Sequence, residues 1–317
     1  MILDILILVF GFFILIKGAD FFIDGASSVA TNFKVPKILI GLTIVAFGTS
    51  APEFAVSIKS IISSNHDIVL GNVIGSNIMN ILLILGISSI IHSLDVKSNT
   101  VKKELPILLL ITCLFVVLLS DSMFDNTLNA FTRSDGIILF LFFLVFLYYL
   151  ISVAKNRNKE VDKKDKEMTL GKSFLYTISG IIMIVFGSEF VVNSSTSIAS
   201  SVGVSEKLIS LTIVAFGTSL PELVTSVTAT KKGEYDLAIG NVVGSCIFNI
   251  GIVMGLPVAL FGGISRINFS NLDIAVMLLS IILLFIFSID DRKLTKREGF
   301  IFLLIFIIYY GYVIISG

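Results

Sequence analysis

Residues 42–50 read LTIVAFGTS, and residues 211–219 read LTIVAFGTS again. The two copies are identical over nine positions and lie 169 residues apart. The same offset aligns further short motifs, namely Pro52-Glu53 with Pro221-Glu222, Gly71-Asn72-Val73 with Gly240-Asn241-Val242, Gly75-Ser76 with Gly244-Ser245, and Asn80-Ile81 with Asn249-Ile250. A fixed period of this kind indicates that the chain contains an internal structural repeat.

The composition predicts a protein embedded in the lipid bilayer. Of 317 residues, 55% are hydrophobic and 15% are charged, with a mean hydropathy of +1.00, whereas soluble domains carry roughly 25% charged residues. Runs such as 107–119, 137–153 and 300–315 are apolar enough to span or nearly span a bilayer. A soluble enzyme with one anchor is excluded. The net charge is zero, so no nucleic-acid partner is indicated, and no obligate protein partner is evident.

Polar or Gly/Pro-containing turns divide the sequence into ten expected transmembrane helices. Their approximate bounds are 3–31, 36–63, 67–91, 104–120, 134–154, 170–201, 205–230, 235–260, 271–289 and 298–316. The first helix contains Lys17 and Asp20, whose i,i+3 spacing predicts an ion pair.

The basic residues test this count of ten, because cytoplasmic loops carry an excess of Lys and Arg. Eighteen of the 23 basic residues fall on one side, while only Lys59, Arg133, Lys207 and Arg266 fall on the other, and Lys17 lies within a helix. The asymmetry predicts a multi-pass protein of the cell membrane with both termini outside and a cytoplasmic loop at 155–169.

Each repeat contains five predicted helices, so the second repeat enters the membrane in the opposite sense to the first. We therefore expect an all-α membrane protein with ten transmembrane helices in two inverted five-helix repeats. Residues 1–154 form the first repeat, 155–169 the cytoplasmic linker and 170–317 the second repeat. Inverted repeats are a recurring plan of secondary transporters, which hold their substrate near the midplane on broken helices.

The repeated motif predicts a break in helices 2 and 7. Pro52 has no N–H and its ring clashes with the carbonyl of Gly48, so the helix kinks or unwinds there. Backbone oxygens around residues 46–49 are then available as ligands. Thr49 and Ser50 precede Glu53 by four and three residues and so share its helix face. The copy at 215–222 repeats this arrangement from the opposite direction.

The next helix of each repeat adds a serine and an asparagine at i,i+4 spacing, Ser76 with Asn80 and Ser245 with Asn249. A single proline kink with nearby hydroxyls is usually only structural. Two identical kinks, each with a glutamate whose burial in the membrane is costly, favour an ion site. Because every donor is oxygen, the site suits a hard cation such as calcium or sodium.

The two motifs closely resemble those of the cation/calcium exchanger superfamily, and within it the prokaryotic sodium/calcium exchangers. The resemblance rests on 48–53 (GTSAPE) with 71–77 (GNVIGSN), and on 217–222 with 240–246. It implies two inverted five-helix repeats with ions at the centre of helices 2, 3, 7 and 8. Its implied function is a secondary active antiport of sodium for calcium by alternating access.

The resemblance also implies a set of ligands. Glu53 and Glu222 would bind calcium together with the carbonyls of Thr49 and Thr218. The sodium ligands would be Ala46, Thr49, Ser50, Glu53 and Ser76 in one repeat, and Ala215, Thr218, Ser219, Glu222 and Ser245 in the other. Asn80 and Asn249 would line the middle. The transported ions are cargo, and no resident cofactor is expected.

Several alternatives remain open. Some relatives, including potassium-dependent exchangers, have Asp at the position of Asn249, so a potassium requirement is doubtful here. Proton-coupled exchangers typically carry GNxxE, which neither repeat shows, and calcium/proton exchange is the second hypothesis. A cation channel could also use carboxylates. An enzyme is disfavoured because no recognisable nucleophile and base are present. Two glutamates that bind either one calcium or three sodium ions predict an electrogenic 3:1 cycle.

Overall fold

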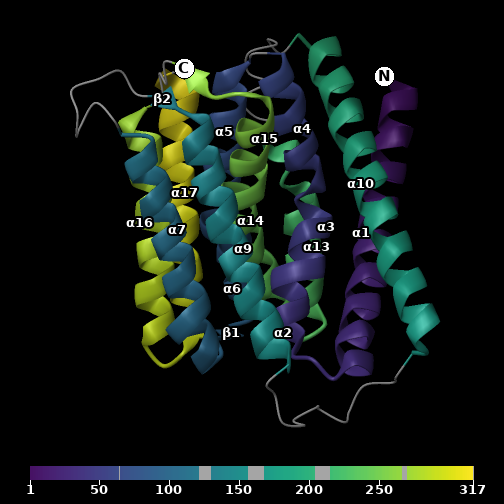
Figure 1. Ribbon diagram of the computed structural model, residues 1–317. Coiled ribbons are helices and arrows are strands. Elements are labelled where there is room, and N and C mark those ends of the chain that lie inside the picture. Colours follow the sequence, from purple (N-terminus) through teal and green to yellow (C-terminus); the bar gives the residue numbers. More distant parts are fainter. Residues whose placement is uncertain (64, 121–129, 156–167, 204–214, 266–269, 317) are drawn as a thin grey trace.

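A computed structural model describes the chain except for residues 64, 121–129, 156–167, 204–214, 266–269 and 317. The described residues form a bundle of helices with two short strand pairs (Figure 1). In the first half of the chain the elements are α1 (Ile2–Phe33), α2 (Lys37–Ile40), the π-helix η1 (Gly41–Val45), α3 (Ala46–Thr49), α4 (Ala51–Ile62), α5 (His66–Ile78), the π-helix η2 (Met79–Leu85), α6 (Gly86–Ile91), β1 (Leu94–Asp95), the π-helix η3 (Thr100–Glu104), α7 (Leu105–Leu118), β2 (Ala130–Phe131) and α9 (Arg133–Lys155).

The second half follows the same order of elements. It contains α10 (Leu170–Ser201), α12 (Ala215–Gly217), α13 (Leu220–Lys231), α14 (Tyr235–Phe248), the π-helix η5 (Asn249–Met254), α15 (Gly255–Phe261), β3 (Ile264–Ser265), α16 (Asn271–Ile289), β4 (Lys293–Leu294) and α17 (Lys296–Ser316). The sequence offset of 169 residues carries the start of α4 onto the start of α13, and the start of α5 onto the start of α14.

Seven described helical spans are long and apolar enough to cross a membrane, and the bent pair 37–49 with 51–62 makes eight. The other two predicted spans are not among these eight, for different reasons. The helix predicted at 104–120 is α7, which has 14 residues and continues from the π-helix η3. The helix predicted at 205–230 includes residues 204–214, which lie outside the described part of the chain. The chain is therefore an all-helical membrane protein with seven or more spans.

The centre of the bundle consists of the helices that carry the glycine, serine and asparagine motifs. In the span 235–261, 89% of the most apolar window is buried, and in 66–91 the value is 72%, against 17% for α9 and α17. Every residue of α14 from Leu237 to Phe248 is buried. Peripheral helices that expose apolar side chains surround this centre, as expected for contact with lipid.

Helices α1 and α10 form a close antiparallel pair along one side of the bundle (Figure 1). A Cβ atom added at Gly18 would lie 2.7 Å from Met183 Cβ, and one added at Gly187 would lie 2.7 Å from the backbone of Leu15. Only glycine permits these backbones to approach so closely. The contact of Gly18 with Ile184 mirrors that of Gly187 with Leu15, because the partners in each contact are related by 169 positions.

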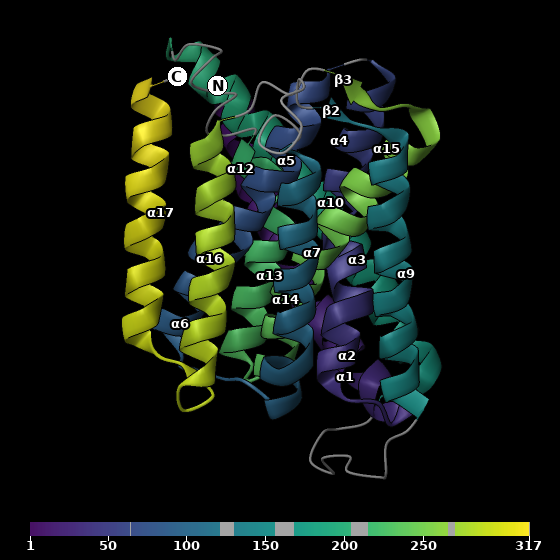
Figure 2. The same cartoon turned by 60° about the vertical axis from the view of Figure 1, so that its left-hand side comes forward.

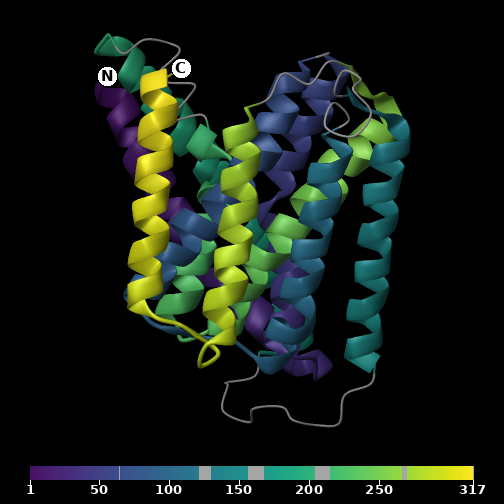
Figure 3. The same ribbon diagram turned by 90° about the vertical axis from the view of Figure 1, so that its left-hand side faces the viewer.

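Two antiparallel strand pairs tie the halves together at opposite ends. Strand β1 pairs with β4, with Leu94 opposite Leu294, and β2 pairs with β3, with Phe131 opposite Ile264. Figure 1 shows β1 at the lower end, and Figure 2 shows β2 and β3 at the upper end. Both termini lie at the upper end in Figure 3. Each pair joins a strand from one half of the chain to a strand from the other.

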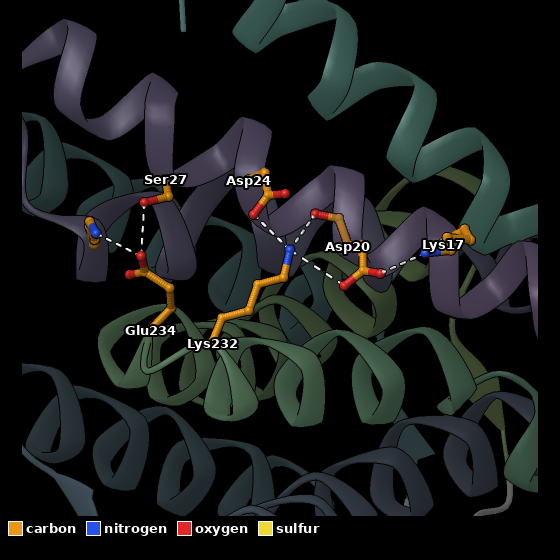
Figure 4. A network of polar contacts seen from close by, with 7 residues as sticks. Lys17, Asp20, Asp24, Ser27, Lys232 and Glu234 are labelled. Atoms are coloured by element: carbon orange, nitrogen blue, oxygen red, sulfur yellow. Dashed lines mark hydrogen bonds and ion pairs between the residues drawn. The ribbon is translucent and has the colours of Figure 1, made fainter. Parts of the chain in front are cut away.

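A polar network joins α1 to the end of α13 (Figure 4). Lys232 Nζ lies 2.7 Å from Asp24 Oδ1 and 3.4 Å from Asp20 Oδ1, and Lys17 Nζ lies 3.7 Å from Asp20 Oδ2. The ion pair predicted between Lys17 and Asp20 is therefore present, and Asp20 is also shared with Lys232. One helical turn further along α1, Ser27 donates to Glu234 at 3.1 Å.

Candidate cation site

The repeated proline motifs produce two matching helix breaks. The segment before Pro52 bends by 48° between residues 37–49 and 51–62. Ser50 forms the break, with φ −85° and ψ 9°, and Ser219 has nearly the same conformation, with φ −89° and ψ 3°. Pro52 and Pro221 then occupy the first turn of α4 and α13, where a missing N–H costs nothing. The predicted kink is therefore a break placed two residues before each proline.

Each break sets a glutamate one turn into the helix that follows it. Glu53 is 1% exposed and Glu222 is fully buried. The break before Glu53 adjoins the second glutamate, since the Ser50 hydroxyl lies 2.8 Å from Glu222 Oε1. Two buried carboxyl groups from opposite halves of the chain are thus held in one region of the bundle, where ionised carboxylates need compensating charge.

The serine at the break binds across to the other half. Ser50 Oγ donates to Glu222 Oε1 at 2.8 Å and lies 3.0 Å from Ser245 Oγ. Ser219 Oγ lies 3.4 Å from Ser76 Oγ, which repeats the Ser50–Ser245 contact at the offset of 169. The sequence predicted that Ser50 shares a helix face with Glu53. Because the helix breaks at Ser50, its hydroxyl instead reaches the glutamate of the other half.

Most of the predicted site residues are buried in this region. Thr218 is half-buried, and the side chain of Ala215 lies outside the described part of the chain. Hydrogen bonds bring Ser50 together with Glu222 and Ser245, and Ser219 together with Ser76. The others are all less than 5% exposed, namely Ala46, Thr49, Glu53, Asn80 and Asn249.

Many of these buried polar atoms have no hydrogen-bond partner among the described residues. Both carboxylate oxygens of Glu53, one of Glu222, and both amide atoms of Asn80 and Asn249 are unpaired. An unpaired buried polar atom costs roughly 1–3 kcal/mol, and a bound cation or water molecule would satisfy these groups. Carboxylate, hydroxyl and amide oxygens together suit a cation. The described residues contain no group of three or more His, Cys, Asp or Glu side chains suited to a metal ion, so neutral oxygens complete the donor set.

The backbone carbonyls near the breaks are not all free. Ala46 O accepts the N–H of Ser50 at 3.0 Å and lies 3.4 Å from the Thr49 hydroxyl. Pro221 cannot donate to Gly217 O, but the hydroxyl of Ser188 donates to that carbonyl at 3.0 Å. Side-chain oxygens are therefore the more available ligands in this conformation.

Sequence reasoning did not assign a role to two asparagines that brace the glutamates. Asn72 Nδ2 donates to Glu53 O at 3.0 Å, and Asn241 Nδ2 lies 3.5 Å from Glu222 O. Asn241 Nδ2 also donates to Ser226 Oγ at 2.8 Å, and its Oδ1 lies 3.0 Å from the Thr49 hydroxyl. These asparagines fix the helices that carry the carboxylates. Asn72 and Asn241 occupy equivalent positions in the two repeats, and this repetition could have predicted that both have a structural role.

Asn77 is a further buried polar residue that sequence reasoning did not assign. It is fully buried, and neither amide atom has a partner among the described residues. The offset of 169 places Cys246 at the equivalent position of the second half. The two halves therefore differ here in polarity, although their motifs are otherwise alike.

Comparison with known proteins identifies the family. A family described as sodium/calcium exchanger protein matches residues 3–152 and 172–315. The chain is 30% identical to the sodium/calcium exchanger MaX1 of Methanosarcina acetivorans, with 96% of each protein covered. It is 35% identical to the inner membrane protein YrbG of Escherichia coli, with 88% of this chain and 86% of that protein covered.

A solved structure of the sodium-calcium exchanger NCX_Mj, soaked with sodium and without calcium, has a similar fold. The TM-score is 0.85, the sequence identity is 32%, and the alignment covers 98% of each chain. The match extends over both halves, including all the helices that surround the buried glutamates.

Proposed function

The chain belongs to the sodium/calcium exchanger family, and on this basis we propose that it is a secondary active antiporter that exchanges sodium for calcium by alternating access. The observation that carries the proposal is the pair of buried glutamates, Glu53 and Glu222, which face a cluster of unpaired oxygen donors. We propose sodium and not the proton as the coupling ion, because the similar proteins MaX1 and NCX_Mj are both named as sodium/calcium exchangers.

The proposed architecture is ten transmembrane helices in two inverted five-helix repeats. The reciprocal glycine contacts of α1 and α10 and the strand pairs at opposite ends of the bundle support it. Residues 1–154 and 170–317 would be the repeats, and 155–169 the linker. By the distribution of basic residues the linker is cytoplasmic and both termini are outside.

The proposed calcium ligands are the carboxylates of Glu53 and Glu222. A dehydrated divalent cation needs both negative charges, and calcium accepts six to eight oxygens in a flexible arrangement. We assign the carbonyls of Thr49 and Thr218 to calcium on the family resemblance. We assign the amide groups of Asn80 and Asn249 to the same space on the family resemblance, and their lack of a hydrogen-bond partner among the described residues supports this.

Sodium would use the same carboxylates together with the hydroxyls and carbonyls around them. The proposed sodium ligands are Ala46, Thr49, Ser50, Glu53, Ser76, Ala215, Thr218, Ser219, Glu222 and Ser245. Because the glutamates serve both ions, calcium and sodium cannot occupy the site together. This exclusive occupancy couples the calcium flux to the sodium flux. Both ions are transported substrates, and the proposal includes no resident cofactor.

The experiment is calcium flux in proteoliposomes that contain the purified protein. Radioactive calcium is added outside, and an outward sodium, potassium or proton gradient is imposed separately while the membrane potential is clamped. We expect calcium uptake with the sodium gradient alone. Uptake that requires the proton gradient and ignores sodium would instead establish calcium/proton exchange. Calcium uptake without any countergradient, together with discrete conductance steps in electrical recordings of the same protein, would establish a channel.

A further inference from the structure

An apolar pocket of about 440 Å³ lies between the α1–α10 pair and the helices α2, η1 and α9. Volumes of this size are typical of ligand sites. Its lining is apolar apart from Thr43, and the Thr43 hydroxyl donates to the carbonyl of Leu39 at 2.6 Å. The interior therefore offers no free hydrogen-bonding side chain, so its ligand must be a hydrocarbon.

The pocket is lined by residues near the last turns of α1 and α9 and the first turn of α10. Figure 1 shows that α1 and α9 end, and α10 begins, at the lower end of the bundle. Of the lining residues, Phe33 is 55% exposed, Ile151 47% and Phe174 40%. The rings of Phe33 and Phe174 meet edge to face across α1 and α10, with centroids 6.2 Å apart. Exposed apolar side chains around a cavity in a membrane protein mark a surface that lipid covers.

Three lysines adjoin the pocket in the sequence. Lys34 stands between the lining residues Phe33 and Val35, Lys155 directly follows Ala154, and Lys172 precedes Phe174 by two positions. All three are exposed, and none forms an ion pair with a carboxylate of the described residues. The Lys172 ammonium lies 5.3 Å from the centre of the Tyr176 ring. These three lysines, called the rim lysines below, place positive charge next to lining residues on α1, α9 and α10.

We propose that this pocket binds one acyl chain of an anionic phospholipid, whose phosphate lies against Lys34, Lys155 and Lys172. A hydrocarbon interior with a cationic rim complements an amphiphile with an anionic head. Basic pockets between transmembrane helices bind anionic lipid head groups in this way. A soluble metabolite would find no polar partner inside the pocket.

A lipid bound here would contact both the α1–α10 pair and the helices that lead into the cation site. The pocket walls come from α1 and α10 on one side, and from α2 and η1 on the other. Helix η1 leads directly into α3 and the break at Ser50. The bound acyl chain therefore bridges the α1–α10 pair and the helix that enters the cation site, and it stabilises their contact.

The test compares phosphatidylglycerol with phosphatidylcholine of identical acyl chains, added to the full-length protein in detergent. Native mass spectrometry measures the lipid retained, and thermal unfolding measures stabilisation, because a ligand that binds only the folded state raises the midpoint. We expect phosphatidylglycerol to be retained in preference and to raise the midpoint. Equal retention of both lipids with equal midpoints would overturn the proposal.

Two variants separate the pocket from general lipid contact. Ala154→Phe fills the pocket from α9, and we expect it to abolish the preferential adduct, whereas Val145→Phe on the same helix, at a side chain 66% exposed, retains it. Leu147→Trp is a second filling variant, in case Ala154→Phe does not fold. If Ala154→Phe or Leu147→Trp folds and still retains phosphatidylglycerol at the wild-type level, the pocket is not the lipid-binding site.

A charge variant tests the rim. Replacing the three rim lysines by glutamine weakens binding of phosphatidylglycerol by at least about tenfold and leaves phosphatidylcholine binding unchanged. The matched control replaces three other exposed lysines at the same end of the bundle, none of them ion-paired within the described residues, namely Lys102, Lys231 and Lys296. If both triple variants lose the same affinity, the effect is that of overall charge and the assignment of the rim is wrong.

Discussion

The proposed site predicts that exchange moves net charge. The proposal places two carboxylates at its centre, Glu53 and Glu222, together with the neutral amides of Asn80 and Asn249, and all four side chains are buried. With both carboxylates ionised, one calcium ion brings the site to zero charge, and three sodium ions bring it to +1. A 3:1 cycle therefore transfers one elementary charge across the membrane for each calcium.

The size of the effect follows from the energy of one charge in the membrane potential. One elementary charge gains about 2.3 kcal/mol per 100 mV. Since about 1.4 kcal/mol corresponds to a factor of ten, the calcium ratio at zero net flux shifts roughly 50-fold per 100 mV. A neutral 2:1 cycle predicts no shift in this ratio.

The assay measures the calcium ratio at which net flux vanishes in proteoliposomes, with sodium concentrations fixed and the potential set by potassium and valinomycin. A matched series at equal potassium, with no potential, controls for potassium itself. We expect the calcium ratio to change by about 50-fold over 100 mV. A ratio that is independent of potential would refute the charge count, and with it either the 3:1 stoichiometry or the ionised state of both glutamates.

Three further predictions concern single side chains. Glu53→Gln and Glu222→Gln each nearly abolish sodium-driven calcium flux while the protein still folds, because an isosteric amide cannot neutralise a dehydrated divalent ion; flux within a few-fold of wild type would remove that residue from the site. Gly18→Leu destabilises the protein by about 1–3 kcal/mol or more through overpacking against α10, whereas Gly171→Leu, where an added Cβ meets no atom within 4 Å, shifts the thermal midpoint little. Asn241→Ala costs about 1–3 kcal/mol of stability, since it removes the amide that donates to the buried hydroxyl of Ser226, and a thermal midpoint equal to wild type would show that Asn241 does not stabilise the packing of α13 on α14.

The sequence predicted the two helix breaks because their signals are local and occur twice. A proline in a membrane segment predicts a kink from covalent geometry alone, and the structure has a 48° bend at that point. The identical copy 169 residues later made a role in ion binding more plausible than a simple kink. The bounds of α1, α10 and α16 also agree with the prediction to within two residues.

The contacts between the two halves could not be predicted, because they depend on the packing of distant segments. The spacing of Ser50 and Glu53 indicated a shared helix face, but the hydroxyl of Ser50 donates to Glu222. The π-helical turns after Ile78 and Phe248 have no recognisable sequence signal. Strands of two residues, such as β1, are too short to show a period of two. These features are set by tertiary structure.

In the proposed exchange cycle, calcium and sodium compete for one site built by both halves of the chain. The most direct measurement is equilibrium binding of radioactive calcium to the purified full-length protein, titrated with sodium and repeated for Glu53→Gln and Glu222→Gln. We expect one calcium per chain, displaced completely by sodium, and no measurable binding in either variant. Calcium that remains bound at saturating sodium, or that binds to either variant as tightly as to the wild type, would contradict competition at a site that needs both glutamates.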